Sequence, residues 1–433
     1  MAHYPNLPGT TVEVQDGQMN LSPEDSSSRV LIIGDVIDSV DAPNEPIRVR
    51  DEYDIKENFG GFIINGRPNP IAVEWASVTK EADVNTYLLA LEGKTEKEKF
   101  VNLHEALFTY LNDFEADHVV LTGLFADQEI DSVEAEDFTD EEIQEAFPNI
   151  PGIITESEGT PDSEDYVELY YANPAMLVAD YAQRQSLQSN ETIAYIGVKP
   201  LEDTSMKSVS KYVKKLVSLD NEFSKYLQVV VGPETGVNVE GSYKMQWATG
   251  IGAYCALVSK LEPQNAPTNQ AFSRVTSLRY LFSLKQLNDL VGNKYVTLTI
   301  RNQQVIAVDG VTTAPDITIG GEKHKSDFTR LSTLRITNYM VQAVRKVTEP
   351  FIGNPSGWPL YTSMTAAIKS EITGAIDAGI IQDARFSISM KDSFDSAIIR
   401  MTILPQFEMR KIRISIGLND PITYGVDSEN ENP

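Results

Sequence analysis

The sequence has one cysteine, four histidines and no long uninterrupted apolar run among its 433 residues. The single Cys255 excludes an internal disulfide framework and fits folding in a reducing cytoplasm. No segment reaches the roughly 18 to 20 apolar residues that a membrane-spanning helix needs. The first residues have neither a basic start nor an apolar core, so we expect no secretory signal.

Basic residues are scarce in the first two thirds of the chain. The net charge is -27, and no Lys or Arg occurs between Lys99 and Arg184. Residues 271–433 carry 18 Lys+Arg and 16 Asp+Glu, whereas residues 1–270 carry 18 and 47. So acidic a surface repels a phosphate backbone, which argues against nucleic-acid binding. We infer a near-neutral C-terminal part that packs against partners and an acidic remainder that faces solvent.

Two glycine-containing segments resemble nucleotide-binding loops only in part. The segment 250–255 begins like a dinucleotide fingerprint, but Cys255 replaces the third small residue and the segment lies within a helical pattern. Close packing of a helix is therefore the better interpretation. The segment 320–326 lacks the spacing of a phosphate loop, so we interpret it as an ordinary surface loop.

The acidic and histidine residues do not form a metal motif. Asp127, Glu129 and Asp131 start like a calcium loop, but Ser132 and Phe138 occupy positions that need glycine and glutamate. The histidines show no metal-ligand spacing. His104 lies on the apolar face of a predicted helix, which indicates a core residue with satisfied hydrogen bonds. The sequence predicts no catalytic residue, no cofactor, no metal site and no enzyme.

Buried strands and amphipathic helices alternate over residues 29–261, which is typical of an α/β layer with a largely parallel sheet. The acidic segment 127–165 looks like a surface excursion. The predicted strands are 29–37, 117–125, 191–198 and 226–233, with short β segments within 41–51 and 60–75. The predicted helices start at residue 96 or span 173–188, 205–219 and 243–261.

The pattern changes after a Pro- and Asn-rich linker at residues 262–272. A hairpin around Asn302 is followed by two amphipathic helices, within 326–353 and 361–381. Three alternating runs close the chain, at residues 385–391, 397–407 and 409–418. These elements favour a module for packing and assembly over an active site.

The sequence thus predicts a multidomain protein of mixed α+β and α/β class, in which an α/β middle domain with a mixed sheet precedes a C-terminal α+β domain. Extended arms are expected at both ends, with a disordered leader as the alternative at residues 1–28. The predicted divisions are an N-terminal extended arm at 1–28, an acidic outward-facing α/β region at 29–265 with a candidate inserted subdomain at about 123–167, a C-terminal α+β domain at 266–408, and a C-terminal strand arm and tail at 409–433.

Several segments, in order along the chain, resemble the tail sheath proteins of contractile phage tails. Residues 4–14, with Pro-Gly before a short strand, resemble the opening of that family, and residues 29–38 resemble its first core strand. Residues 242–269 resemble its small-residue helix and linker, and residues 288–418 are the closest match. Sheaths of phage-tail-like contractile injection systems are similar, and the sequence does not separate the two. The acidic segment near 123–167 has no counterpart.

The resemblance implies a structural protein of a virion tail. Such a protein polymerises as hexameric rings around an inner tail tube and contracts to drive the tube through the host envelope, for host cell entry and genome ejection. The implied partners are further copies in a helical homo-oligomer of stacked hexamers, the inner tail tube protein, and baseplate and tail terminator proteins. No cofactor, nucleic acid or membrane insertion is implied, and assembly would take place in the cytoplasm of a bacterial host.

The resemblance also implies that both arms donate a strand to the C-terminal sheet of neighbouring subunits. Such strand addition satisfies unpaired edge groups, and alternate side chains fill pockets. The predicted arm-strand residues are Thr11, Val12, Val14, Ile412, Ile414 and Ile416. Contact with the tube would fall to basic residues on helices of the C-terminal domain, namely Arg330, Arg335, Arg345, Lys346 and Lys369.

Two other functions remain open at this point. An α/β nucleotide-binding enzyme built on the middle domain predicts a discrete oligomer with a stoichiometric small ligand. Another tail component, such as a tube or baseplate protein, is the third interpretation, although a tube protein is usually a much smaller single domain.

Overall fold

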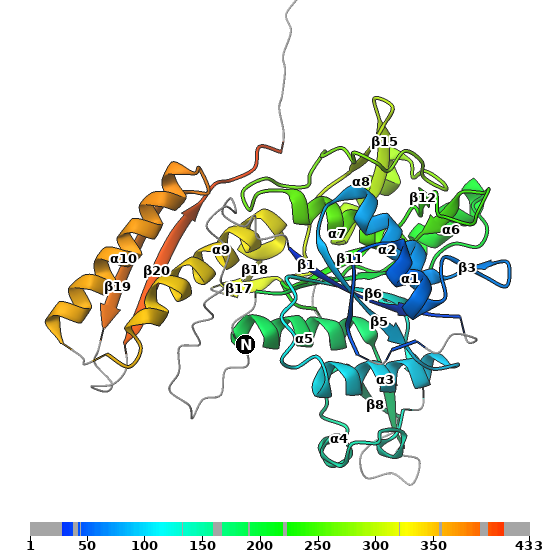
Figure 1. Ribbon diagram of the computed structural model, residues 1–433, viewed down its shortest axis with the longest axis horizontal. Coiled ribbons are helices and arrows are strands. Elements are labelled where there is room, and N and C mark those ends of the chain that lie inside the picture. Colours follow the sequence, from blue (N-terminus) through cyan, green and yellow to red (C-terminus); the bar gives the residue numbers. More distant parts are fainter. Residues whose placement is uncertain are drawn as a thin grey trace, which may run out of the picture.

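The structure is a computed structural model in which the chain forms a large body and a smaller outer unit (Figure 1). The body comprises residues 28–330. The outer unit comprises residues 331–405 and projects from one side of the body (Figure 1). The residues that the structure describes are 28–37, 42–43, 45–131, 133–158, 167–188, 191–219, 223–319, 321–354, 357–389 and 397–410.

A seven-stranded mixed sheet forms the centre of the body. Its strand order is β14-β11-β10-β6-β1-β5-β2, and every neighbouring pair is parallel except β2 with β5. The sheet confirms the predicted mixed α/β class and the predicted buried strands. Its strands are β1 (Arg29–Asp35), β2 (Ile47–Val49), β5 (Asn85–Leu91), β6 (His118–Phe125), β10 (Ile193–Gly197), β11 (Leu227–Val230) and β14 (Tyr295–Val296).

Strand β1 lies inside the sheet because its sequence is apolar on both faces. Val30 to Ile33 form a continuous apolar run that is fully buried. The register places Ile32 between Leu88 of β5 and Val120 of β6. A strand without polar alternation must be covered on both sides, so helices are required above and below the sheet.

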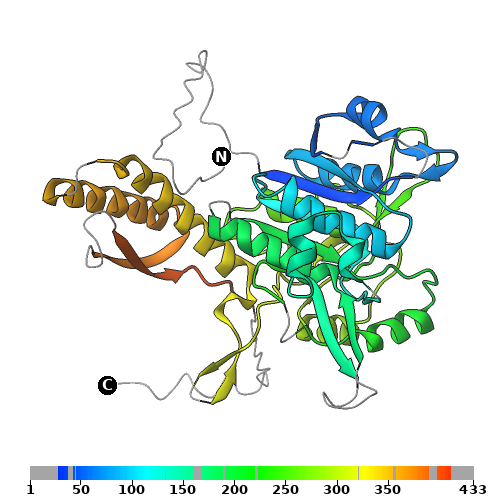
Figure 2. The ribbon, with the colours of Figure 1, turned by 90° about the horizontal axis from the view of Figure 1, so that it is seen from below.

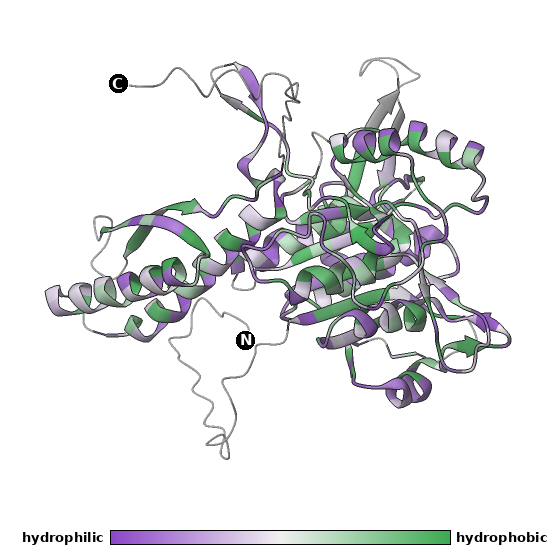
Figure 3. Ribbon diagram, turned by 90° about the horizontal axis from the view of Figure 1, so that it is seen from above, coloured by the Kyte–Doolittle hydropathy of each residue, from purple (hydrophilic) through white to green (hydrophobic). Residues whose placement is uncertain are grey.

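Helices cover both faces of this sheet (Figures 1 and 2). Helices α2 and α7 pack against each other and against β6. Helices α3 and α5 form a second pair, which also contacts β6. Apolar residues concentrate on the strands and on the helix faces turned toward them (Figure 3). The longer helices of the body are α1 (Glu52–Phe59), α2 (Pro70–Glu81), α3 (Glu96–Thr109), α5 (Pro174–Gln188), α6 (Met206–Lys215), α7 (Ile251–Lys260) and α8 (Leu284–Gly292).

The segment 60–75 differs from its predicted β structure. Short strands β3 (Ile63–Ile64) and β4 (Arg67–Pro68) form there as predicted, but α2 begins at Pro70. Proline is favoured at the first position of a helix because its missing N–H has no intrahelical partner there. The following apolar residues Ile71, Trp75 and Val78 then lie at helical spacing and are buried.

The helix predicted over residues 243–261 forms only from Ile251, because Gly250 adopts a left-handed φ of 86°. Residues 246–248 instead form β13 (Gln246–Ala248), which pairs with β12 (Thr235–Val237). Glu74 of α2 accepts hydrogen bonds from the N–H groups of Thr249 and Gly252 at the start of α7. A Cβ atom on Gly252 would lie 2.7 Å from the Glu74 carboxylate, so close helix packing explains this glycine.

The described part of the acidic segment 127–165 packs onto the body through Val133 and Phe138, which are buried in its core. It supplies β7 and β8, the two outer strands of a three-stranded sheet of order β7-β9-β8. The elements of this region are β7 (Ile130–Asp131), the 3-10 helix η2 (Ala135–Asp137), α4 (Glu141–Ala146), β8 (Ile153–Glu158) and β9 (Val167–Ala172).

His104 of α3 is buried as predicted, but its hydrogen bonds are not satisfied. Neither ring nitrogen has a hydrogen-bond partner. The ring instead stacks on Phe108 with centroids 4.4 Å apart and meets the edge of Phe138 at 5.3 Å. Burial lowers the pKa of His104 to about 4, so the neutral ring acts as an aromatic residue in the core.

The described residues of 266–330 belong to the body and not to the outer unit, since Phe272, Tyr280 and Leu298 are part of the core of the body. The predicted hairpin around Asn302 is confirmed, and Asn302 has a φ of 50°. Further elements of this region are β15 (Leu298–Arg301), β16 (Gln304–Ala307), β17 (Ile317–Ile319), β18 (Glu322–His324) and the 3-10 helix η3 (Asp327–Thr329).

The outer unit consists of two helices and one antiparallel hairpin, which confirms the predicted helices and the first two alternating runs. The third run, at 409–418, lies outside the described residues except for its first two. The elements are α9 (Leu331–Thr348), the 3-10 helix η4 (Glu349–Phe351), α10 (Trp358–Asp377), β19 (Ile381–Ser389) and β20 (Ile398–Pro405). Of the helices that the structure describes, none has the length and apolar character to cross a membrane.

Candidate functional site

Helix α9 joins the body to the outer unit and belongs to the hydrophobic core of each. Leu331 and Leu334, in its first turn, are buried in the core of the body. Ile336, Met340 and Val344 are buried in the core of the outer unit. Because one continuous helix spans both cores, the contacts of α9 with the body determine how the outer unit is oriented.

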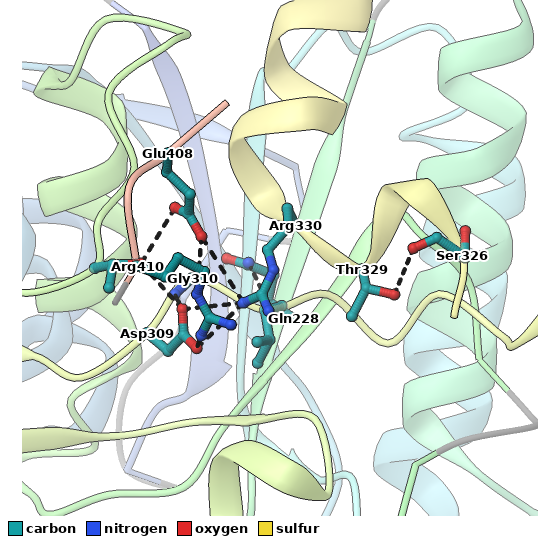
Figure 4. A network of polar contacts seen from close by, with 10 residues as sticks. Gln228, Asp309, Gly310, Ser326, Thr329, Arg330, Glu408 and Arg410 are labelled. Carbon is teal, nitrogen blue, oxygen red and sulfur yellow. Dashed lines mark hydrogen bonds and ion pairs between the residues drawn. The ribbon is translucent and has the colours of Figure 1, made fainter. Parts of the chain in front are cut away.

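Four charged residues gather at the start of α9 (Figure 4). Asp309 Oδ2 lies 3.2 Å from Arg330 Nη1 and also pairs with Arg410. Glu408 Oε1 lies 3.2 Å from Arg410 Nε and 3.8 Å from Arg330 Nη1. We call Asp309, Arg330, Glu408 and Arg410 the clasp.

The clasp holds both chain connections of the outer unit to one point of the body. The chain enters the outer unit at Arg330 and returns from it at Glu408 and Arg410. The carboxylate of Asp309, whose side chain is 3% exposed, accepts hydrogen bonds from Thr268 Oγ1 at 3.0 Å and from the Gly310 N–H at 2.9 Å. Two carboxylates face two guanidinium groups, which is the charge balance that a poorly solvated site requires.

Burial raises the pKa of the Glu408 carboxyl, and the nearby charge of Asp309 raises it further, whereas Arg330 and Arg410 oppose the rise. The two arginines therefore favour the charged form of the Glu408 carboxyl. Removing either carboxylate or either arginine leaves an unbalanced charge next to the start of α9.

Arg335 attaches the first half of α9 to the C-terminal end of α7. Its guanidinium donates hydrogen bonds to the carbonyl oxygens of Leu261 and Glu262, the latter at 3.2 Å. Leu261 is the C-cap residue of α7. The last carbonyl groups of a helix lack intrahelical partners and carry partial negative charge, so a cation there stabilises the helix end.

Arg345 attaches the last turn of α9 to the end of α5 and to the loop between α5 and β10. Its Nη1 lies 3.0 Å from Glu191 Oε1, and its Nη2 donates a hydrogen bond to the Ser186 carbonyl at 3.3 Å. Burial raises the pKa of Glu191 to about 7, and the charge of Arg345 opposes this rise. The strength of this attachment therefore changes with pH in the neutral range.

Three of the five residues predicted to face a tube are thus engaged within the chain. Arg330, Arg335 and Arg345 position α9 on the body. Lys346, in the last turn of α9, and Lys369, on α10, are exposed. Contact of these five residues with a tube stays a prediction.

The six predicted arm-strand residues lie outside the described part of the chain. Arg410 of the clasp is the last residue that the structure describes, so the segment that carries Ile412, Ile414 and Ile416 starts directly from the clasp. Their pairing with a neighbouring subunit is untested.

The hairpin of the outer unit has open edges. Within the described residues, β19 and β20 pair only with each other. Helices α9 and α10 pack against the hairpin, while side chains such as Leu404 remain exposed on it. Unpaired N–H and C=O groups along such edges are a template for pairing with another strand.

The carboxyl edge of the large sheet is where open α/β folds bind ligands, beside the strand at which the order reverses. Here Asp35, at the end of β1, pairs with Lys99 of α3 at 2.7 Å. The Asp35 carboxylate also lies over Gly123 of β6, where a Cβ would be 2.2 Å from it. A ligand phosphate at this position would have to displace the ion pair. In the described ranges, no group of three or more His, Cys, Asp or Glu residues could hold a metal ion.

Comparisons with known proteins give matches among solved structures. No protein-family model and no curated protein matches the chain. A chain of the anti-feeding prophage (AFP) baseplate, 6-fold symmetrised, aligns with a TM-score of 0.59 at 11% identity over 96% of this chain and 99% of that chain. A chain of the AFP helical sheath in the contracted state gives 0.56 at 10% identity over 95% and 99%. The PVC sheath complex of an extracellular contractile injection system, in its contracted state, gives 0.57 at 10% over 96% and 99%.

At identities of 10–11% these alignments establish a shared fold. The fold covers nearly the whole of this chain and of each compared chain, so the body, α9 and the outer unit belong to one common architecture. The likeness to sheath proteins that the sequence predicts is confirmed at the level of the fold.

Proposed function

We propose that this chain is the subunit of a contractile sheath. The observation that carries the proposal is the outer unit, a small α+β module with open strand edges that is clamped to a large body by α9 and the clasp. The fold shared with chains of contractile-sheath structures over at least 95% of the sequence supports the same function. The function is therefore structural, and its chemistry is strand pairing between copies.

Subunits in this proposal form hexameric rings stacked around an inner tail tube, and contraction drives the tube through the host envelope. The arms at 1–28 and 409–433 add strands to the open edges of β19 and β20 in neighbouring copies. Head-to-tail contacts of this kind do not close on themselves, so they propagate into a tube. The bodies then turn as rigid units while the outer units stay connected.

The packing suggests where the two parts of the proposed subunit divide. The sequence predicts a boundary near residue 265, but the described residues of 266–330 contribute to the core of the body. We place the functional boundary within α9, between Leu334 and Ile336, because the two hydrophobic cores separate there. The partners are further copies, a tube protein, and baseplate and terminator proteins, in a phage tail or a related injection machine.

Electron microscopy of the purified chain tests the proposal. In negative stain, the full chain should form rings or long hollow tubes with a helical repeat. A variant that lacks residues 411–433 keeps the clasp but loses the C-terminal arm, so it should remain unassembled while folding normally. A monomer or small discrete oligomer of the full chain, unchanged by concentration and salt, would refute the proposal.

A further inference from the structure

An apolar pocket that no part of the proposed assembly uses lies at the amino edge of the large sheet. Its volume is about 500 Å³, within the range of pockets that bind other molecules. Its walls include Met176, Leu187, Phe223 and Ile317. Leu187 is 70% exposed and Ile317 is 40% exposed, although both lie beside buried apolar residues. The pocket therefore presents apolar surface that a partner could cover.

Lys225 gives this pocket a cation, and Asp180, the one carboxylate among the described lining residues, is paired with Arg184 at 2.7 Å. Its Nζ lies 4.2 Å from the ring centroid of Phe328 and 4.9 Å from that of Tyr226. Within the described ranges, no carboxylate lies within 4.0 Å of this ammonium group, and nearby Glu191 is paired with Arg345. Burial lowers the pKa of Lys225, because the half-buried cation is poorly solvated. A carboxylate beside apolar side chains is the complement that this pocket lacks.

The N-terminal segment starts at the same edge of the sheet. Residues 1–27 are joined through Ser28 to β1, and Tyr226 of the pocket directly precedes β11. Strands β1 and β11 are three positions apart in the order β11-β10-β6-β1, which corresponds to roughly 14 Å. Extended chain spans about 3.3 Å per residue, so the four to nine residues before Ser28 reach roughly 13 to 30 Å. Residues 19–24 are therefore within reach of the pocket.

The sequence of that segment has the complementary chemistry. It reads Met-Asn-Leu-Ser-Pro-Glu from residue 19 to residue 24. Met19 and Leu21 are two positions apart, so an extended chain presents both on one side. Pro23 favours an extended conformation in the residue before it. From Leu21 on, the polyproline II conformation that Pro23 favours has three residues per turn, so Glu24 lies on the same side as Leu21.

We propose that the pocket is the seat of the chain's own residues 19–24, with Met19 and Leu21 against Leu187 and Phe223 and with Glu24 paired to Lys225. The contact is within one chain and does not require assembly. It would determine the direction in which residues 11–14 leave the body. The pocket, which we call the seat, is thus a docking surface for residues 19–24 of the N-terminal arm.

Photo-cross-linking of the full chain tests the seat directly. With p-benzoylphenylalanine in place of Leu21, illumination should join residue 21 to peptides that contain Leu187, Phe223 or Ile317. A mixture of heavy- and light-isotope chains separates the sources, and the expected products join residues of one chain. Products between heavy and light chains, or at sites away from the pocket, would overturn the assignment to the chain's own segment.

Charge variants with matched controls sharpen the test. Glu24→Gln and Lys225→Gln should each lower the yield of these products at least threefold, whereas Glu13→Gln and Lys215→Gln should leave it unchanged. Glu24→Gln alters no residue of the folded body, so it remains informative if Lys225→Gln impairs folding. Unchanged yields in Glu24→Gln would contradict the ion pair. The cross-link forms within one chain, so its absence would not bear on the sheath proposal. Likewise, a failure to assemble would not bear on the binding of residues 19–24 in the pocket.

Discussion

The body and the outer unit differ in how completely each encloses its own hydrophobic residues. The body surrounds a seven-stranded sheet with helices, and its core includes residues from most of its elements. Among its described residues, the core of the outer unit has nine buried residues, packed between two helices and one hairpin. A two-stranded sheet is marginal alone. The difference supports the proposal that the outer unit gains strands from another chain, whereas the body needs none.

Charged residues join the two parts in addition to the apolar contacts of Leu331 and Leu334. The clasp, Arg335 and Arg345 attach α9 to the body at three points. Ion pairs fix direction and geometry, but their net contribution to stability is small compared with a core. The connection can therefore hold the outer unit in position while each part keeps its own fold.

Asp309→Ala should weaken the connection between the body and the outer unit more than any other change described below. It removes the carboxylate shared by Arg330 and Arg410, and we expect a loss of about 2–4 kcal/mol in the free energy of unfolding. Urea unfolding should then separate into two transitions, with Trp358 reporting on the outer unit and Trp75 on the body. The exposed Asp383→Ala should change stability by less than ~0.5 kcal/mol. One transition at the wild-type midpoint in Asp309→Ala would contradict the role of the clasp.

Arg335→Met should weaken the same connection less. The carbonyls of Leu261 and Glu262 lose their guanidinium donor, which costs about 1–3 kcal/mol when the groups are shielded from water. Urea unfolding measures this loss. Arg385→Met, on an exposed face of β19, serves as the matched control and should be close to neutral. Equal stabilities of the two variants would count against an attachment through Arg335.

Glu191 makes the connection sensitive to pH. Its pKa is about 7 in the folded chain, above its ordinary value of 4.5, because it is buried. Between these values the folded state holds a proton that the unfolded state has released. The stabilisation from this group is therefore fully present below pH 4.5 and is lost as the pH rises through 7.

We therefore expect the free energy of unfolding to fall more steeply between pH 5 and pH 8 in the wild type than in Glu191→Gln. Urea unfolding series at several pH values provide the measurement. Parallel curves for the two proteins would show that Glu191 does not titrate in this way.

His104→Leu should have the smallest effect and should act only within the body. The pKa of His104 is about 4 in the folded chain, below its ordinary value of 6.5, so its contribution to stability is lost as the pH falls from 6.5 toward 4. Leucine has no group that titrates and no unpaired buried nitrogen. The substitution should therefore add about 1 kcal/mol to the free energy of unfolding at pH 5. Thermal unfolding at pH 5 and pH 8 checks the gain. A variant less stable than the wild type at both values would contradict it.

Elements with long and clear periodicity were predictable from the sequence. Strand β1, with its apolar run, and helices α3, α5, α9 and α10, with regular apolar spacing, form where the pattern indicates. The errors occur where an apolar run fits both periods, as at residues 70–75, or where one glycine interrupts a helical pattern, as at Gly250. Local backbone preferences decide those cases.

The candidate site could be predicted only in part, because its residues meet through the fold. Arg330, Arg335 and Arg345 were noticed as basic residues on a helix, but their partners were not. Asp309 and Arg410 are 101 positions apart, and Glu191 and Arg345 are 154 apart. No local spacing marks such pairs. Glu408, Asp309 and Glu191 are therefore visible only once the chain is folded.

We propose that copies join along the open edges of the β19–β20 hairpin. Hydrogen exchange of the backbone amides in Ile381–Ser389 and Ile398–Pro405, compared between unassembled and assembled protein, measures this pairing. We expect edge amides of this hairpin to exchange rapidly in the unassembled chain and to become protected on assembly, while amides of β1 and β6 stay protected in both. Assembly that leaves exchange along the hairpin unchanged would rule out strand pairing at these edges.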